Sequence, residues 1–255
     1  MKYDDVMKLA LERGFYFPSC EIYSDAQAGF WEYGPAGVSL KNKFLELWRR
    51  ELLRRDKMIE IDGSQIMSSS VFEASGHLTS FADPIVRCTK CKSTHRADRI
   101  ISELAKIEIP ESADLEEFDK VITEKNIKCP KCNGNFENTK KFNMMFQVGI
   151  GPEGEPAYLR PETCQSIFVD FPRLFKTMRG KLPLGIAQTG KSFRNEIAPR
   201  QSLLRLREFY QAEIEVFCNP AKLNDLDKFS EIQDTEIRIQ VNDEVKALTC
   251  KEAVD

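Results

Sequence analysis

The sequence predicts an α+β fold in which an antiparallel sheet is flanked by helices and carries a small cysteine-bearing insertion. Three observations lead to this fold class. Two runs that alternate between apolar and polar residues flank a loop between Gly185 and Phe217, as the strands of a hairpin do. An apolar stripe at helical spacing extends from Val38 to Arg55. Two Cys-x-x-Cys pairs with helical patterns between them indicate the insertion.

Composition limits the classes of function. The 255 residues carry a net charge of −3 and are 42% hydrophobic, which suits one large domain, with or without an insertion. The charge excludes a generally basic nucleic-acid binder, so any RNA contact must be local. No apolar run approaches the roughly 18–20 residues of a membrane span. Because the N-terminus also lacks the apolar core of a signal peptide, we expect a cytoplasmic protein without membrane contact.

The first elements are helical. Asp4 to Arg13 predicts a short helix that ends at Gly14. Val38 to Arg55 predicts the longest helix, and a single strand is expected over residues 58–67. The stripe of this longest helix is formed by Leu40, Phe44, Leu47, Trp48 and Leu52.

The paired cysteines indicate a metal site. Cys88 and Cys91, then Cys129 and Cys132, each place two thiols on one tight turn, and two such turns complete a tetrahedron of soft ligands for Zn²⁺. Disulfides are the alternative, which a chain without an export signal disfavours. His95 is an outside candidate ligand. The sequence therefore predicts a zinc-binding insertion over residues 88–132.

Within and after this insertion the pattern alternates between helix and strand. Arg96-Ala97-Asp98 is expected to open one helix, which continues through Ile107, and Ser112 is expected to cap a second. Paired strands are expected over 142–148 and 157–160, joined by a turn whose GxGxxG spelling lacks the helix of a nucleotide fold. A helix is expected from 160–163 through Phe175, and residues 218–255 are expected to be polar and helical.

The polar face of the hairpin is the candidate binding surface. Gln188, Gly190, Ser192, Arg194 and Glu196 share that face with Phe209, Gln211, Glu213 and Glu215. Pro199, Arg200, Arg205 and Arg207 lie between the strands. Arginines supply fork-shaped donors for phosphates, and Phe209 offers a stacking surface. Cross-strand ion pairs on a solvated hairpin are an equally good interpretation of the spacing alone.

The order of these residues resembles a known family. Phe193-Arg194-Asn195-Glu196, followed by Arg205-x-x-x-Phe209-x-x-x-Glu213, resembles the second signature motif of class II aminoacyl-tRNA synthetases. The wider wording, GIAQTGKSFRNEIAPR with LLRLREFYQAEIEVF, is similar to glycyl-tRNA synthetases of the archaeal and eukaryotic type. The resemblance implies the class II synthetase fold, an antiparallel sheet flanked by helices.

The resemblance also implies roles for site residues in ATP binding. Arg194 would hold the α-phosphate and act in catalysis, while Arg205 would reach the γ-phosphate with Arg207 nearby. Phe209 would stack on adenine and Glu196 would accept from its amino group. Asn195, Leu204 and Glu208 would complete the wall. Mg²⁺ is implied by the triphosphate rather than by a motif.

The Arg160-Pro161-Glu162-Thr163 run resembles the family segment that lines the amino-acid pocket. Glu162 and Glu213 would pair with the glycine ammonium, beside Phe209 and Gln211, with Arg96 as a weaker candidate. The chain continues Cys164-Gln165-Ser166, where the family more often has alanine and glycine, which alters pocket packing. His77 is interpreted as a hydrogen-bonded loop histidine at least as readily as a catalytic one.

The resemblance divides the chain into a catalytic core with motifs 1 and 2 (1–87 and 133–217), the zinc insertion (88–132) and the truncated start of a further insertion (218–255). The third motif and an anticodon-binding domain are not found in these residues, so residues 1–255 alone are expected to be inactive or weak. The implied partners are glycine, ATP and tRNA(Gly). The helix of motif 1 implies a homodimer, although Ser68, Ser69 and Ser70 replace its usual proline. The alternative function is a non-catalytic synthetase-like module that binds a partner or RNA.

Overall fold

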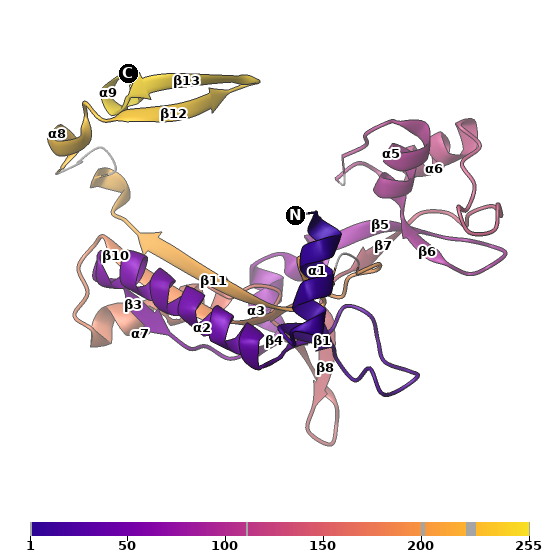
Figure 1. The fold of residues 1–255 in the computed structure, drawn as a ribbon, viewed down its shortest axis with the longest axis horizontal. Helices are drawn as coiled ribbons and strands as arrows, with labels where there is room; N and C mark the ends of the chain where they lie inside the picture. Colours follow the sequence, from indigo (N-terminus) through magenta and orange to yellow (C-terminus); the bar gives the residue numbers. More distant parts are fainter. Residues whose placement is uncertain (1, 111, 200–201, 223–227, 255) are drawn as a thin grey trace.

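A computed structural model describes residues 2–110, 112–199, 202–222 and 228–254. Its central element is the antiparallel hairpin of β10 (Leu184–Phe193) and β11 (Glu208–Phe217), which β3 (Ile59–Ile61) joins in parallel alongside β10 (Figure 1). Gln188 lies opposite Glu213, and Ser192 lies opposite Phe209. The register therefore confirms the predicted sharing of one polar face.

Helices cover both faces of this hairpin. α2 (Pro35–Trp48) continues into a π-helical stretch, η1 (Arg49–Arg54), and crosses the face that carries Tyr210, where Lys41 Nζ lies 3.9 Å from the Tyr210 ring centre (Figure 1). α7 (Cys164–Thr177) packs on the opposite, polar face. Gln188 and Ser192 on that polar face are fully buried, whereas Tyr210 on the apolar side is exposed. The polar face is therefore the more enclosed one.

The N-terminal segment adds α1 (Tyr3–Glu12) and a small two-stranded sheet of β1 (Tyr16–Pro18) and β2 (Trp31–Tyr33). The predicted first helix is confirmed, and it ends as expected because Gly14 adopts a positive φ of 64°. A short 3₁₀ turn, η2 (Ser202–Leu204), lies between β10 and β11.

A second sheet has the order β4-β9-β8, formed by β4 (Ile66–Ser68), β9 (Glu155–Leu159) and β8 (Phe146–Ile150). Two short helices, α3 (Ser69–Ala74) and α4 (His77–Ser80), follow β4. The predicted single strand over 58–67 is wrong, because β3 and β4 belong to different sheets. The chain turns between them where the carbonyls of Gly63 and Ser64 accept from the buried Arg160 guanidinium.

The predicted strand over 142–148 is also divided, between β7 (Lys140–Asn143) and β8. β7 pairs with β5, whereas β8 pairs with β9. Asn143 explains the break, because its side chain accepts from the Met145 N–H and donates to the carbonyls of His77 and Leu78. The turn expected after β8 is present at 151–154.

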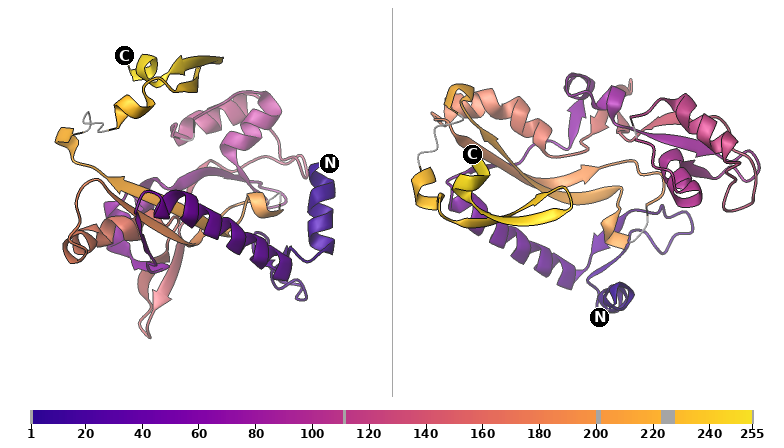
Figure 2. Two further views of the ribbon diagram at one scale, coloured as in Figure 1. Left: turned by 60° about the vertical axis from the view of Figure 1, so that its left-hand side comes forward. Right: turned by 90° about the horizontal axis from the view of Figure 1, so that it is seen from above.

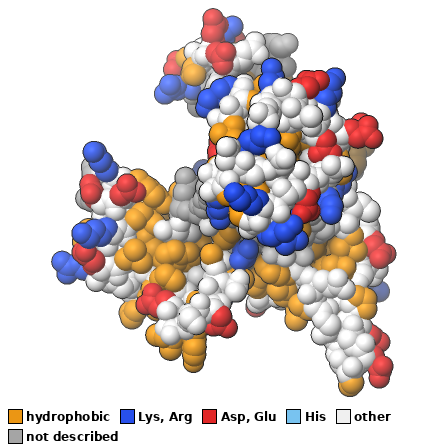
Figure 3. All heavy atoms as spheres, turned by 90° about the vertical axis from the view of Figure 1, so that its right-hand side faces the viewer, with side chains coloured by type: hydrophobic (Ala, Val, Ile, Leu, Met, Phe, Trp, Pro, Cys, Tyr) orange, Lys and Arg blue, Asp and Glu red, His pale blue; other side chains and the backbone are white. Residues whose placement is uncertain are grey.

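The cysteine-bearing part forms its own lobe (Figures 1 and 2). It contains β5 (Ala82–Arg87), β6 (Thr94–Arg96), α5 (Ala97–Ala105) and α6 (Leu115–Glu124), with sheet order β6-β5-β7. Asp114, rather than the predicted Ser112, precedes α6 as its N-cap residue. The buried apolar cluster of this lobe is Val86, Ala97, Ile100, Ile101, Ile109, Phe118, Ile122 and Ile127. Figure 3 faces this lobe, on which both signs of charge are interspersed.

The last residues are η3 (Pro220–Lys222), α8 (Phe229–Ile232), β12 (Glu236–Val241), β13 (Glu244–Thr249) and α9 (Cys250–Val254). The helical expectation for 218–255 is wrong, since β12 and β13 form a hairpin with Asn242 at a positive φ of 55° in its turn. Ile237 and Ile239 alternate with polar neighbours, which is the period of a strand. No helix among the described residues has the length and apolar character of a membrane span.

Candidate active site

Two carboxylates from distant segments meet on the polar face of the hairpin. Oxygen atoms of Glu162 and Glu213 lie with Cys164 Sγ in a group whose members are all within 4.8 Å of one another. Glu213 Oε2 accepts from the backbone N–H of Thr163 at 2.8 Å and from the Thr163 hydroxyl, while Glu213 Oε1 accepts from Gln211 Nε2 at 2.8 Å. Glu213 is therefore fixed by both α7 and its own strand.

Glu162 lies just outside α7. The prediction that residues 160–163 open the helix is wrong by a few residues, because Thr163 is the N-cap and the helix begins at Cys164. Glu162 Oε1 accepts from Gln165 Nε2 at 2.7 Å and lies 3.2 Å from Cys164 Sγ. His77 Nε2 is 3.3 Å from the same oxygen.

This pocket favours a cation. Burial, then the neighbouring Glu213 and Glu162, raises the pKa of Glu215, which follows Glu213 on the same face of β11. Burial and the carboxylate of Glu162 also raise the pKa of the Cys164 thiol. Both shifts have the sign that surplus negative charge produces. A ligand with an ammonium group would relieve this repulsion.

Arg194 contacts the residue before Glu162 and suits a different kind of ligand. Its guanidinium is 5.4 Å from the ring centre of Phe209 and 5.5 Å from that of Phe81, and its Nε donates to the Pro161 carbonyl at 3.2 Å. Within the described ranges, no carboxylate forms an ion pair with it. Its terminal nitrogens are thus available to an anion such as phosphate.

The other predicted nucleotide residues are already engaged. Arg205 Nε donates to Glu196 Oε2 at 2.7 Å, and Arg207 donates to the carbonyls of Glu196 and Ala28, both at 2.9 Å. Glu208 pairs with Lys191. Cross-strand ion pairing, the alternative interpretation of the spacing, therefore holds for Arg205 but not for Arg194.

Two further predicted residues, Asn195 and Leu204, contribute little through their side chains in this structure. Asn195 contributes its backbone N–H to the Met144 carbonyl at 2.7 Å. The Leu204 side chain is 70% exposed, so it forms little of a wall. Arg200 lies outside the described residues.

Arg96 pairs with two other carboxylates. Its guanidinium donates to Asp83 at 3.0 Å and to Asp98 at 2.8 Å and is mostly buried. With Ala198 and Arg205, Arg96 lines a separate cavity of about 630 Å³ between the lobe and the hairpin loop. The structure therefore gives Arg96 two acidic partners that the sequence did not predict.

Sequence reasoning gave no role here to Phe81, Gln165 or Glu215, and it preferred a loop role for His77. Gln165 is only 5% exposed, and its amide oxygen has no partner among the described residues. These side chains come from segments far apart in the chain. Glu215 is linked to Glu213 by strand alternation and Gln165 lies three residues after Glu162, but no spacing pattern links Phe81 or His77 to Glu162, so only the fold could bring these two to the site.

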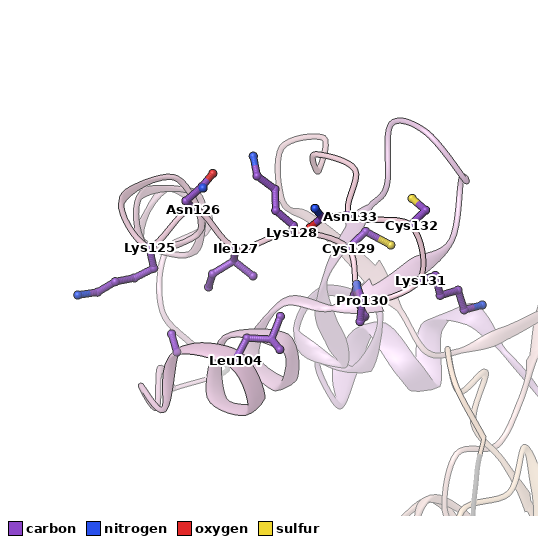
Figure 4. Close-up of a pocket in the computed structure, with 11 residues that line it drawn as sticks. Leu104, Lys125, Asn126, Ile127, Lys128, Cys129, Pro130, Lys131, Cys132 and Asn133 are labelled. Carbon is purple, nitrogen blue, oxygen red and sulfur yellow. The ribbon is translucent and has the colours of Figure 1, made fainter.

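The four paired cysteines form one cluster. Their Sγ atoms all lie within 4.8 Å of one another, with Cys88 3.5 Å from Cys132 and Cys91 3.7 Å from Cys129. A tetrahedron of Zn–S bonds of about 2.3 Å requires S···S separations of about 3.8 Å. Figure 4 shows Cys129 and Cys132 on their turn, with Lys131 directed away from the sulfur atoms. The donor set therefore fits Zn²⁺.

His95 lies beside this cluster without completing it. Its Nε2 is 2.9 Å from Ser93 Oγ and 3.8 Å from Cys129 Sγ. The turn after Cys132 is also shaped by the cluster, because a Cβ at Gly134 would lie 3.0 Å from Cys88 Sγ. Four thiols therefore suffice for the metal, and His95 is a neighbour of the ligands.

Comparison with known proteins agrees with the geometry. Residues 138–236 match the family described as the tRNA synthetase class II core domain (G, H, P, S and T). The chain is 42% identical to the glycine--tRNA ligase of Methanothrix thermoacetophila over 100% of this chain and 44% of that protein. It is 46% identical to the glycine--tRNA ligase of Pyrococcus furiosus, over 93% of this chain and 41% of that protein. The chain thus spans less than half the length of these curated relatives.

Solved structures show the same fold at low sequence identity. The RNA binding domain of threonyl-tRNA synthetase from Cryptosporidium parvum aligns with a TM-score of 0.51 and 20% identity, over 91% of this chain and 43% of that one. A threonyl-tRNA synthetase, ThrRS-1, from Aeropyrum pernix aligns with a TM-score of 0.50 and 17% identity, over 88% of this chain and 37% of that chain. The predicted α+β fold of class II type and the predicted family resemblance are confirmed.

Proposed function

We infer that the chain belongs to the class II aminoacyl-tRNA synthetases and forms the N-terminal part of the catalytic core of a glycine–tRNA ligase. The observation that carries this inference is the meeting of Glu162 and Glu213 beside Arg194, in a chain similar to glycine--tRNA ligases along its whole length. Two carboxylates suit an ammonium and an arginine between two rings suits a phosphate. An amino acid and ATP present these groups together.

The proposed reaction needs positioning rather than a protein base. A carboxylate oxygen of glycine attacks the α-phosphorus of ATP, the bond from that phosphorus to the oxygen bridging the β-phosphate breaks, and pyrophosphate leaves. The nucleophile is already ionised at neutral pH, so no proton must be removed. Catalysis then rests on orientation and on stabilisation of charge at the phosphate. The glycyl group is afterwards transferred to the 3′ end of tRNA(Gly).

For ATP, we assign the α-phosphate to Arg194 and the adenine ring to Phe209. Arg205 is directed to the γ-phosphate and Glu196 to the adenine amino group. Since Arg205 and Glu196 are paired with each other at 2.7 Å in this structure, nucleotide binding has to exchange that ion pair for ligand contacts. Asn195, Arg207 and Glu208 act through the backbone and ion-pair contacts described above. Mg²⁺ enters with the triphosphate.

For glycine, we assign the ammonium to Glu162 and Glu213, with Gln211 holding Glu213 in place. Phe209 lies on the same face and closes the pocket towards the nucleotide. Arg96 stays the weaker candidate for this site, with its guanidinium held by Asp83 and Asp98. Selectivity for glycine would follow from a tight pocket that excludes side chains.

We propose four larger features. The chain divides into a core, a lobe from β5 to β7 that extends the zinc segment 88–132 in both directions, and a further segment from residue 218. The lobe binds one structural Zn²⁺ through Cys88, Cys91, Cys129 and Cys132. The protein forms a homodimer through α2, and as a translation enzyme it acts in the cytoplasm.

The proposed function is tested by glycine-dependent exchange of pyrophosphate into ATP, measured on the full-length protein. Glycine should support exchange, whereas threonine, proline and serine should not. Arg194→Ala should reduce exchange by about 10²–10³-fold, the effect of losing one preorganised donor. If none of the amino acids supports exchange, and if Arg194→Ala leaves nucleotide binding unchanged, the non-catalytic module is favoured instead.

A further inference from the structure

One short segment touches both halves of the proposed site. Residues 75–81 run from the end of α3 through α4, and their side chains reach two targets. His77 Nε2 lies 3.3 Å from Glu162 Oε1, in the amino-acid pocket. The Phe81 ring centre lies 5.5 Å from the guanidinium of Arg194, the residue proposed to bind the phosphate. The proposed assignments above use neither side chain.

The orientation of His77 is fixed on every side. Its Nδ1 is 2.8 Å from Ser75 Oγ, which leaves Nε2 to face Glu162. Its ring meets the buried Phe72 edge-on at 6.1 Å and lies 5.3 Å from the Phe81 ring. A carboxylate has no hydrogen to offer, so the contact is favourable when Nε2 carries the hydrogen and Nδ1 accepts from Ser75.

The backbone of the segment is anchored to the same sheet region as the site. Asn143 Nδ2 donates to the carbonyls of His77 at 3.0 Å and Leu78 at 2.9 Å. The next residue, Met144, accepts from the Asn195 N–H at 2.7 Å. The segment is thus connected to the residue beside Arg194, and His77 is held against Glu162 by more than its own side chain.

Glu162 itself needs such support. It precedes α7 and so lies outside the regular hydrogen bonding of the helix. Gln165 Nε2 donates to Glu162 Oε1 at 2.7 Å, and His77 Nε2 lies 3.3 Å from that same oxygen. A carboxylate that must present its remaining lone pairs to an ammonium benefits from a fixed orientation, because little side-chain entropy is then lost when the ligand binds.

We propose that residues 75–81 are a positioning element for amino-acid activation, in which His77 orients Glu162 for the substrate ammonium and Phe81 supports Arg194 for the phosphate. The proposal rests on the proposed function, since it names how that same site is held. His77 and Phe81 act through other side chains and touch neither reacting atom. Substitutions at the two ends of one segment should therefore affect different substrates.

A matched pair of variants separates orientation from packing at His77. His77→Phe keeps a ring between Phe72 and Phe81 but loses the N–H, whereas His77→Gln keeps an N–H and loses the ring. In pyrophosphate exchange with the full-length protein, His77→Phe should raise KM for glycine on the order of tenfold and leave KM for ATP unchanged. His77→Gln should stay within about threefold of wild type.

Phe81→Leu provides the converse arm. It should raise KM for ATP or lower kcat on the order of threefold, with KM for glycine unchanged, because a cation–π contact contributes less than a charged hydrogen bond. Equal effects on both substrates in His77→Phe, or a larger defect in His77→Gln than in His77→Phe, would overturn the proposal in favour of packing. Absence of glycine-dependent exchange in the wild-type protein would instead refute the proposed function.

Discussion

Glu162, Glu213 and Glu215 bring negative charge together at the polar face of the hairpin. Arg160 interacts electrostatically with Glu213, but its guanidinium donates to the carbonyls of Gly63 and Lys191. Arg194 is turned to the Pro161 carbonyl and two aromatic rings. Like charges brought together and partly desolvated cost free energy unless a ligand compensates them. The charge arrangement therefore favours a substrate ammonium in this pocket over a neutral ligand.

Replacing Glu162 tests the ammonium assignment directly. Glu162→Gln removes the charge but keeps the shape, and it should weaken glycine more than ATP. Losing a charge-assisted hydrogen bond costs on the order of 1.5–3 kcal/mol. Equilibrium binding of each ligand measured separately is the suitable experiment. An equal loss for both ligands, or an unchanged affinity for glycine, would contradict the assignment.

Glu215 gives a prediction about stability and pH. Burial, followed by Glu213 and Glu162, raises its pKa above the ordinary 4.5, so the folded state binds the proton more tightly than the unfolded state. The stability that Glu215 contributes is present below its pKa in the unfolded state, and it is lost as the pH rises through its pKa in the folded state. Glu215→Gln should therefore raise the melting temperature at neutral pH relative to wild type.

The difference between the two proteins should shrink as the pH approaches 4, where Glu215 is protonated in wild type as well. Thermal unfolding followed across this range without substrate provides the measurement. A variant less stable than wild type at neutral pH would show that Glu215 has a favourable partner in the folded protein.

Residue types at the site were predictable only where a motif carried them. Glu162, Arg194, Phe209 and Glu213 follow from the family resemblance, and the structure brings Glu162 to Glu213 as that resemblance implies. His77 was not preferred as a site residue, because its distance in sequence from Glu162 hides their contact. The ion pair of Arg96 with Asp83 was not predicted, since the sequence pattern does not show that the two side chains meet.

At the level of elements, the hairpin was predictable because both strands alternate over their whole length. Short strands were not. Residues 58–67 carry a continuous strand pattern, yet Gly63 and Ser64 leave the sheet to bind Arg160. That guanidinium also donates to the Lys191 carbonyl at 2.9 Å, and Gly190 leaves it space, because a Cβ there would lie 2.3 Å from Arg160 Nη2. A buried tertiary contact thus decides where the strand ends.

The cysteine lobe is the element whose stability should depend on metal. Protein purified without added metal should contain one zinc per chain by elemental analysis. Cys129→Ser should lose that zinc and unfold the lobe, because a structural site supplies folding free energy, while the β10–β11 hairpin should survive. Cys250→Ser, outside the cluster, is the matched control and should keep its zinc. A zinc content near zero with four titratable thiols would disprove the site.

At the scale of the whole molecule, the outer side of α2 leaves apolar side chains exposed. Its predicted apolar stripe exists, but much of it faces solvent, with Leu40 59% and Phe44 61% exposed. Isolated apolar residues on a surface are ordinary, whereas a contiguous stripe along one helix marks an interaction site. A groove of about 580 Å³ lined by α2 and Tyr210 continues this surface.

A second copy of the chain is the partner that we propose for this stripe, so the oligomeric state should depend on it. Phe44→Glu places a charge where two copies would bury apolar surface, and it should convert a dimer to a monomer in sedimentation at micromolar concentration. Leu104→Glu, on α5 of the lobe and 52% exposed in wild type, introduces the same charge on another helix and should leave the dimer intact. A stable interface buries about 1,200–2,000 Å² of surface, so a dimer needs the whole apolar stripe of α2 and not one contact at its edge. Loss of the dimer in both variants would indicate a general charge effect, and a wild-type monomer would refute the assignment of α2 to self-association.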